Sequence, residues 1–199
     1  MLIDRWFPTV IAREECPFWP NEKNDCMSYL DNLNNPIIDT GIQKDLHGNK
    51  YHNIHKMDKF KKLSDWVTSC VNQYAKLHLF PDNYKCVASW GLDYKKYSSQ
   101  PFHSHKGSTI SCIFYAVSNE NDANTIFKSP INDMKNPQKM GVDKKLSGEL
   151  YNEFTEPTCY YKPIEGTLLI FRSYVEHSTN IKETESRRYV ISFDFDYEN

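Results

Sequence analysis

The sequence predicts a mainly β domain in which an antiparallel sandwich or barrel is flanked by helices. One amphipathic helical segment ends before Pro81, several strand-like segments follow it, and helices and strands do not alternate as they do in βαβ folds. The chain has 199 residues, which suits one domain, and 14% of them are aromatic. That aromatic content excludes a disordered chain or a coiled coil.

Residues 59–78 are predicted to form an amphipathic helix that packs on a flat surface. Apolar residues recur in this segment at every third or fourth position, namely at Phe60, Leu63, Trp66, Val67, Cys70, Val71 and Tyr74. The preceding residues 30–56 are polar and rich in Asn, Asp and Gly. We expect loop there, with a short helix near residues 26–32.

Four segments after Pro81 are rich in β-branched and aromatic residues and are predicted strands: Lys85–Tyr94, Thr109–Val117, Thr167–Ser173 and Arg188–Phe195. Residues 118–163, between the second and third strands, are charged and interrupted by prolines, as is typical of lids and binding loops. We therefore expect a single domain over residues 1–199. It has helical support at about 1–80, a β core at about 85–197, and the variable insert at 118–163.

Charge and cysteine usage restrict the class of partner. Lys and Arg number 24 against 26 Asp and Glu, so the formal net charge of −2 disfavours nucleic acid and anionic membranes as partners. A basic cluster in the insert is interpreted as solvated loop; it consists of Lys135, Lys139, Lys144 and Lys145. The six cysteines form no Cys-x-x-Cys pair, the N-terminus lacks a signal-peptide core, and no apolar run is long enough to span a membrane. We expect a cytoplasmic protein with reduced thiols, acting on a small molecule or a peptide.

Two histidines one residue apart, His103 and His105, are candidate metal ligands. On a strand, side chains two positions apart point to the same face, so two imidazoles can converge on one ion. His177 follows the third predicted strand and is the candidate third ligand. Two ligands that are close in sequence and a third that is distant in sequence can form a metal site in a barrel, with open coordination positions. A metal-free pair of rim histidines remains the alternative, and we expect the other four histidines outside the site: His47, His52, His55 and His78.

Arg188, at the start of the last predicted strand, is a candidate anion-binding residue. Alternation places Arg188 and Ser192 on one face, where a guanidinium and a hydroxyl suit a carboxylate. A surface arginine, or Arg187 as the binding group instead, is the alternative. Tyr115 shares a face with Ser111 on the second strand and is a candidate further donor.

Several motifs resemble those of Fe(II)- and 2-oxoglutarate-dependent oxygenases, and most closely the group with a His-x-His motif. The resemblance lies in the order of His103-Ser104-His105, the strand Ser111–Val117, the segment Gly166–Ser173 with His177, and Arg188. It covers residues 86–195 well and the N-terminal part only thinly.

This resemblance implies a double-stranded β-helix, or jelly-roll, core with helices outside it. By carry-over, three histidines match the iron ligands, namely His103, His105 and His177. Arg188 matches the residue that binds the distal carboxylate of 2-oxoglutarate, with Ser192 or Tyr115 as a further donor.

The chain also departs from the pattern that it resembles. The wider superfamily usually has Asp or Glu where His105 stands, so a third neutral imidazole would leave the iron more positively charged. Arg172 replaces Pro, Val190 replaces a Ser near the arginine, and Asp194 replaces Asn.

The function implied by the resemblance is that of a dioxygenase. It would use Fe(II), 2-oxoglutarate and O₂, hydroxylate an unidentified substrate, and release succinate and CO₂. Two alternatives stay open at this point: a cupin-type metalloenzyme that does not use 2-oxoglutarate, and a non-enzymatic jelly-roll binding protein without a metal.

Overall fold

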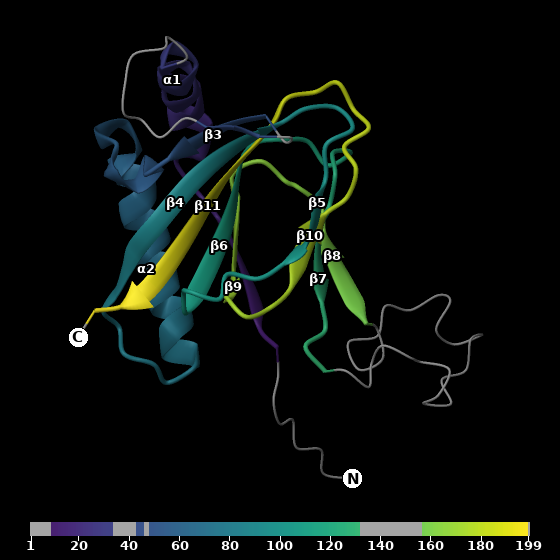
Figure 1. Ribbon diagram of the computed structural model, residues 1–199. Coiled ribbons are helices and arrows are strands. Elements are labelled where there is room, and N and C mark those ends of the chain that lie inside the picture. Colours follow the sequence, from purple (N-terminus) through teal and green to yellow (C-terminus); the bar gives the residue numbers. More distant parts are fainter. Residues whose placement is uncertain (1–8, 34–42, 46–47, 132–156, 199) are drawn as a thin grey trace, which may run out of the picture.

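Two antiparallel sheets and two helices make up the computed structural model, which describes residues 9–33, 43–45, 48–131 and 157–198 (Figure 1). The large sheet has seven strands in the order β1 (Ile11–Glu15), β9 (Thr167–Arg172), β6 (Ile110–Val117), β11 (Arg188–Tyr197), β4 (Tyr84–Tyr94), β3 (Gly48–His52) and β2 (Gln43–Asp45). The small sheet has four strands in the order β5 (Gln100–His103), β10 (His177–Thr179), β7 (Thr125–Lys128) and β8 (Thr158–Tyr161). The mainly β class with flanking helices is thus confirmed.

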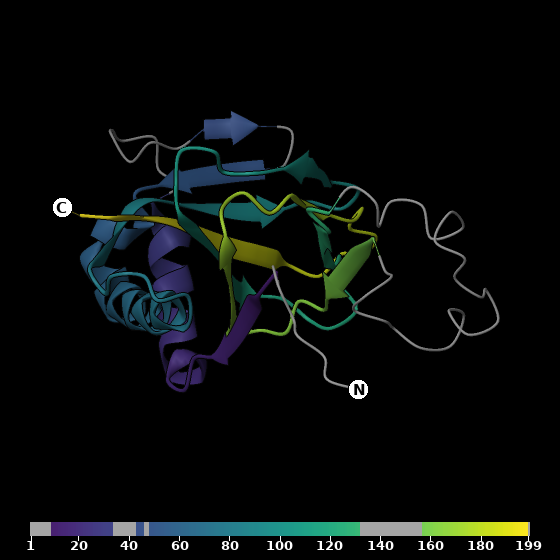
Figure 2. The ribbon, with the colours of Figure 1, turned by 90° about the horizontal axis from the view of Figure 1, so that it is seen from below.

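The two helices, α1 (Trp19–Asn32) and α2 (Lys61–Leu77), cover the face of the large sheet that is turned away from the small sheet (Figures 1 and 2). The predicted stripe of α2 is the buried one, with Val67 and Val71 fully enclosed. A proline in the first turn of α1 suits a helix start, because the first N–H groups have no partner within the helix. Trp19 then anchors α1 to the sheet: its indole N–H donates to the Ala116 carbonyl at 2.9 Å. Two 3-10 turns, Ile54–Lys56 and Asp58–Phe60, lead into α2.

The large sheet separates two hydrophobic clusters. One lies between this sheet and the helices and includes Phe114, Ile191 and Phe193. The other lies between the two sheets and includes Tyr115 and Val190. Neighbouring residues of one strand therefore enter different clusters, as the two-residue period of a strand requires.

The long strands were predicted to within two residues at their ends, whereas the short ones were missed. Residues 30–56 were expected to be loop, but the part described contains β2, β3 and a 3-10 turn. The helix expected near residues 26–32 starts earlier, at Trp19. The N-terminal region also contributes β1 to the large sheet, paired with β9.

The insert over residues 118–163 is also more regular at its ends than expected. It begins with β7 and finishes with β8, which pair with each other at the edge of the small sheet. Residues 132–156, including the basic cluster at Lys135–Lys145, lie outside the described residues, as does the whole N-terminal segment 1–8.

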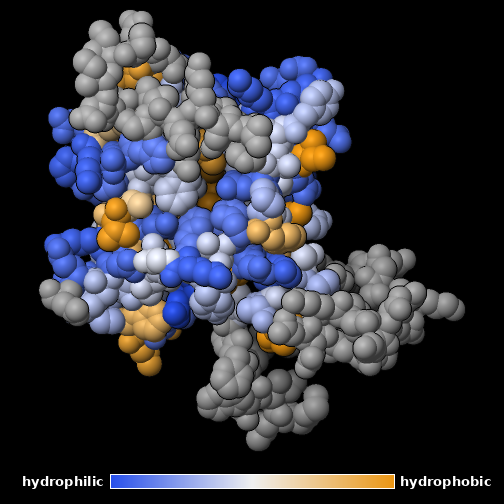
Figure 3. Space-filling view, viewed as in Figure 1, coloured by the Kyte–Doolittle hydropathy of each residue, from blue (hydrophilic) through white to orange (hydrophobic). Residues whose placement is uncertain are grey.

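None of the described helices is long and apolar enough to cross a membrane. On the face shown in Figure 3 the described residues are mainly hydrophilic, and the hydrophobic ones form small separate areas. All six cysteines are free thiols.

Gly91 is required by close packing between β4 and its surroundings. A Cβ atom at this position would overlap the Tyr189 hydroxyl, lie 2.6 Å from Cζ of Tyr189, and lie 2.8 Å from Cδ1 of Ile54. We expect Gly91→Ala to destabilise the fold by about 1–3 kcal/mol, the usual cost of overpacking a core. Urea unfolding measures this, with Gly107→Ala as control because a Cβ there meets nothing within 4 Å. Equal midpoints for the two variants would contradict the packing argument.

Candidate metal centre

Three histidines from the small sheet and the loop that follows β5 converge. His103 is the last residue of β5, His177 is the first of β10, and the two are paired across the antiparallel ladder. His105 lies beyond the end of β5, where its backbone N–H donates to the Ser173 carbonyl at 3.0 Å. The prediction that both members of the His-x-His pair share one strand face is therefore wrong. The turn after β5, and not the strand pleat, brings His105 to the other two.

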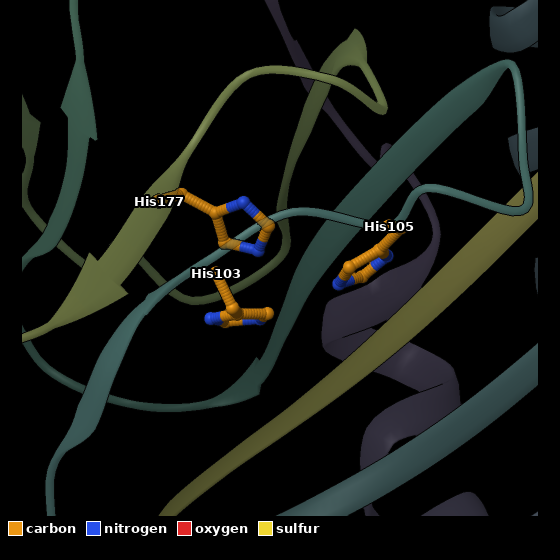
Figure 4. Close-up of side chains that lie close together, drawn as sticks. All are labelled: His103, His105 and His177. Carbon is orange, nitrogen blue, oxygen red and sulfur yellow. The ribbon is translucent and has the colours of Figure 1, made fainter.

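The three imidazoles point toward one another (Figure 4). One potential ligand atom from each residue lies within 4.8 Å of those of the other two. The ring centroids are separated by 4.2 Å for His103 and His177, by 5.1 Å for His105 and His177, and by 5.3 Å for His103 and His105. Small adjustments of the rings suffice to bring three nitrogens to about 2.1 Å from one ion.

Hydrogen bonds fix which nitrogen of each ring is available. Nδ1 of His103 lies 2.9 Å from the Pro101 carbonyl, and Nδ1 of His177 lies 3.2 Å from the Val175 carbonyl. A carbonyl oxygen only accepts, so the neutral rings carry their proton on Nδ1. Nδ1 of His105 lies 2.7 Å from Oδ1 of Asp194, which assigns the same tautomer. All three Nε2 atoms are left with a lone pair for a metal.

The local environment keeps two of the rings neutral. Burial, reinforced by the neighbouring His103 and His105, lowers the pKa of His177 to about 3. Burial also lowers the pKa of His103, and the nearby His105 adds to the effect. Metal binding needs neutral imidazole, so these shifts favour a ligand role.

Aromatic side chains surround the cluster. The rings of Phe171 and Phe127 lie 4.8 and 5.9 Å from that of His177, and the ring of Trp90 lies 5.2 Å from that of His105. His177 itself is only 4% exposed. The remaining histidines lie outside this group where the structure describes them. His55 is half-buried, with Nδ1 2.7 Å from the Ser89 hydroxyl, and His47 falls outside the described residues.

Asp194 is the site residue that the sequence did not identify as such. It lies on β11, is buried, and forms one network with His105 and two serines. The Ser111 hydroxyl donates to Oδ1 of Asp194 at 2.7 Å and lies 2.8 Å from the Ser173 hydroxyl. The available signal was strand alternation, which puts Asp194 on the same face as Arg188 and Ser192.

Arg188 is buried on that same face of β11. It is 1% exposed, and its Nε and Nη1 have no hydrogen-bond partner. The guanidinium lies 4.3 Å from the ring centroid of Tyr94 and 5.8 Å from that of Tyr115. No carboxylate of the described chain forms an ion pair with it. Arg188 is therefore a buried cation without an anionic partner among the described residues.

Arg187, the sequence alternative to Arg188, faces away from the site. Its guanidinium makes a two-pronged bond to Asp31 at 2.7 and 2.9 Å and also contacts Asp93. Arg172, which stands where the resemblance has Pro, is also directed elsewhere, over the rings of Phe80 and Tyr174.

Tyr115 lies beside Arg188, whereas Ser192 is four residues further along β11 and two residues from Asp194. The Tyr115 hydroxyl donates to Oγ1 of Thr125 at 2.7 Å, and burial raises the pKa of Tyr115 to about 12. The hydroxyl is therefore already committed as a donor. Ser192 is buried on the Arg188 face of β11.

Two sheets enclosing three convergent imidazoles define a jelly-roll protein with a candidate metal centre. The sequence profile of the family described as "Putative 2OG-Fe(II) oxygenase" matches residues 88–194, just over half of the chain. The chain belongs to this family of Fe(II)- and 2-oxoglutarate-dependent oxygenases, which use O₂. Membership decides against the cupin-type and non-enzymatic alternatives. No curated protein matches the chain by sequence.

Solved structures share the fold at low sequence identity. HygX from Streptomyces hygroscopicus, crystallised with nickel and 2-oxoglutarate, is 14% identical with a TM-score of 0.63, covering 95% of this chain and 83% of that one. The 2-oxoglutarate-dependent epimerase SnoN from nogalamycin biosynthesis is 10% identical with a TM-score of 0.66, covering 95% and 79%. A Pseudomonas putida prolyl-4-hydroxylase is 12% identical with a TM-score of 0.59, covering 96% and 94%. These similarities confirm the jelly-roll fold.

Replacing any one of the three histidines should abolish tight metal binding. We expect His103→Ala, His105→Ala and His177→Ala each to weaken Co(II) or Fe(II) binding by more than about 100-fold, since removing even an outer partner of a ligand costs about 10–100-fold. Anaerobic metal titration measures the affinity. His78→Ala, at the end of α2, is the control and should bind as the wild type does. Retained binding in His105→Ala would remove that residue from the ligand set.

The buried His177 should also make the metal-free protein sensitive to acid. Its pKa is about 3 in the folded chain and about 6.5 when unfolded, so between these values the unfolded chain binds the extra proton. Stability contributed by neutral His177 is present above pH 6.5 and is lost as the pH falls toward 3. In urea unfolding with chelator at pH 7, 6 and 5, the wild type should lose up to about 1.4 kcal/mol more per pH unit than His177→Gln. Parallel slopes would contradict the shift.

Proposed function

We propose that the protein is a 2-oxoglutarate-dependent dioxygenase of the hydroxylase type. In this proposal His103, His105 and His177 hold Fe(II), and Arg188 binds the distal carboxylate of 2-oxoglutarate. The observation that carries it is the buried Arg188 guanidinium, two of whose nitrogens lack partners. An unpaired buried cation is costly, and a carboxylate bound to it offsets the cost.

The donor set fits the metal. Neutral imidazole is a good ligand for Fe(II), and three ligands from one side leave positions for a bidentate 2-oxoacid and for O₂. When bound, Fe(II) with 2-oxoglutarate and O₂ supplies an oxidative decarboxylation that releases succinate and CO₂ and inserts one oxygen atom into a substrate C–H bond.

The chain itself binds and orients the cosubstrate. The Arg188 fork suits a carboxylate, and the Tyr94 and Tyr115 rings on either side restrict where the guanidinium points. Ser192, on the same strand face, is the proposed second donor. Because the Tyr115 hydroxyl already donates to Thr125, its part is ring packing against Arg188 rather than a direct bond to the carboxylate.

Aromatic walls favour oxygen transfer over epimerisation. An epimerase must return a hydrogen to the substrate carbon, which calls for a thiol or phenol close to the metal. In the part of the chain that the structure describes, the rings that contact the three histidines are Trp90, Phe127 and Phe171, which have neither group. The buried phenols of the same hydrophobic cluster, Tyr94 and Tyr115, are hydrogen-bonded to Gln100 and Thr125. The Phe127 and Phe171 rings instead shield the buried His177 side of the cluster from water.

The substrate is proposed to be a small molecule or a peptide. The near-neutral charge of the chain gives it no general attraction for nucleic acid. Succinate formation, measured separately with amino-acid, peptide and nucleotide pools, identifies the class. Stimulation by the nucleotide pool alone would contradict this assignment.

Arg188→Ala should separate cosubstrate binding from metal binding. Loss of the charge-assisted bonds is expected to weaken 2-oxoglutarate binding by about 30-fold or more, corresponding to about 2 kcal/mol, while metal affinity stays within a few-fold of wild type. Anaerobic titration of the Fe(II) protein, followed by the metal-to-ligand charge-transfer band, measures the first quantity. Metal titration measures the second.

Arg187→Ala is the matched control, since it removes the neighbouring guanidinium from an outward-facing pair with Asp31 and Asp93. It should bind 2-oxoglutarate as the wild type does. If Arg188→Ala binds 2-oxoglutarate with wild-type affinity, as followed by the charge-transfer band, the proposed role of Arg188 is wrong. If the iron-loaded wild type gives no charge-transfer band with 2-oxoglutarate, the proposed function is wrong.

A further inference from the structure

The three candidate ligands bring no negative charge to the metal. In the described chain, the group of side chains that could share one ion consists of His103, His105 and His177 alone. Neutral imidazoles leave the full charge of a divalent ion uncompensated, beside the apolar rings of Phe127 and Phe171. A partly buried charge of this kind needs a nearby opposite charge.

One carboxylate lies directly behind this ligand set. Oδ1 of Asp194 is 2.7 Å from Nδ1 of His105, on the side of the ring opposite Nε2. The side chains of His105 and Asp194 are 11% and 9% exposed, so water screens their interaction only weakly. Asp194 forms no ion pair with a Lys or Arg of the described residues.

The surrounding structure holds the Asp194 carboxylate in place. Ser111 donates to the same oxygen at 2.7 Å, and the Ser173 hydroxyl lies 2.8 Å from that of Ser111. The alternation of β11 directs Asp194 to the sheet face that carries Arg188, and it pairs there with Ser111 of β6. Strand alternation and the Ser111 hydroxyl, which lies next to that of Ser173, thus hold the carboxylate against His105.

A carboxylate bonded to the far nitrogen of a ligating imidazole does two things. It fixes the tautomer and orientation of the ring, and it makes the ring a stronger electron donor to the metal. An amide in the same place would retain the first effect and lose the second.

We propose that Asp194 is a positioning residue that supplies, through the His105 ring, the negative charge that the three-imidazole ligand set lacks. This inference rests on the proposed function, because it requires His105 to bind the iron. Asp194 touches neither metal nor cosubstrate and acts only through His105.

The test compares Asp194→Asn with Asp196→Asn in the full chain. Asp196 is two positions along the same strand, and its carboxylate accepts from Thr109 Oγ1 at 2.9 Å without contacting the histidines. Fe(II) affinity and the energy of the Fe(II)·2-oxoglutarate charge-transfer band are measured anaerobically, together with the melting temperature in chelator.

We expect Asp194→Asn to weaken Fe(II) binding by about 10-fold and Asp194→Ala by about 100-fold. The band of Asp194→Asn should move to higher energy, because a more positive iron holds its electrons more tightly. Asp196→Asn should match the wild type in both measurements. Wild-type affinity and band position in Asp194→Asn would overturn the inference, and so would an equal shift in Asp196→Asn.

Ser111→Ala provides a readout that a purely structural role would not give, and it serves even if the Asp194 variants do not fold. Removing the donated hydrogen bond leaves more of the carboxylate's charge directed at His105, so the band should move to lower energy, opposite to Asp194→Asn. A shift to higher energy, or none, would overturn the inference. If the inference fails but the wild type gives the charge-transfer band and His105→Ala loses its metal, the proposed function still holds. A wild type without metal binding would overturn both.

Discussion

The alternation of side chains along β11, held between β4 and β6, is the constraint on which the site depends. Its odd-numbered residues from Tyr189 to Phe195 are fully buried in the cluster against the helices. The even-numbered residues therefore face the small sheet, and these include Arg188 and Asp194. A register slip of one residue would exchange the two sets. Burial of the odd-numbered residues thus fixes where the functional groups point, which links the packing of α1 and α2 to the chemistry on the other face of the sheet.

The long elements could be predicted because their own sequence carries the signal. The stripe of α2 and the aromatic and β-branched runs of β4, β6, β9 and β11 bury enough apolar surface to specify their conformation. The short strands β2, β3, β7 and β8 have three to five residues each, too few for a periodic pattern. Their conformation comes from partners distant in sequence, as when β3 pairs with β4. No local pattern contains that information.

The site divides in the same way. His103, His177 and Arg188 stand at the ends of regular strands, so spacing and the family resemblance were enough to select them. His105 was selected correctly as a member of the cluster but for the wrong structural reason, since it lies in the turn beyond β5. Asp194 was noted only as a departure from a pattern. Its relation to His105 depends on the path of that turn, which is a tertiary feature.

Arg188 and Asp194 both carry a free-energy cost in the folded chain, and one pair of ligands would offset both. Both are buried on one face of β11. In the described chain the first has no carboxylate partner and the second has no Lys or Arg. Each opposes folding in isolation, because a buried charge without a counter-charge is unfavourable. They are too far apart on the strand to pair with each other, six residues being roughly 20 Å. A divalent cation at the histidines and a dicarboxylate reaching to the arginine would neutralise both ends together. The binding energy of the two ligands then stabilises the fold as well as assembling the site.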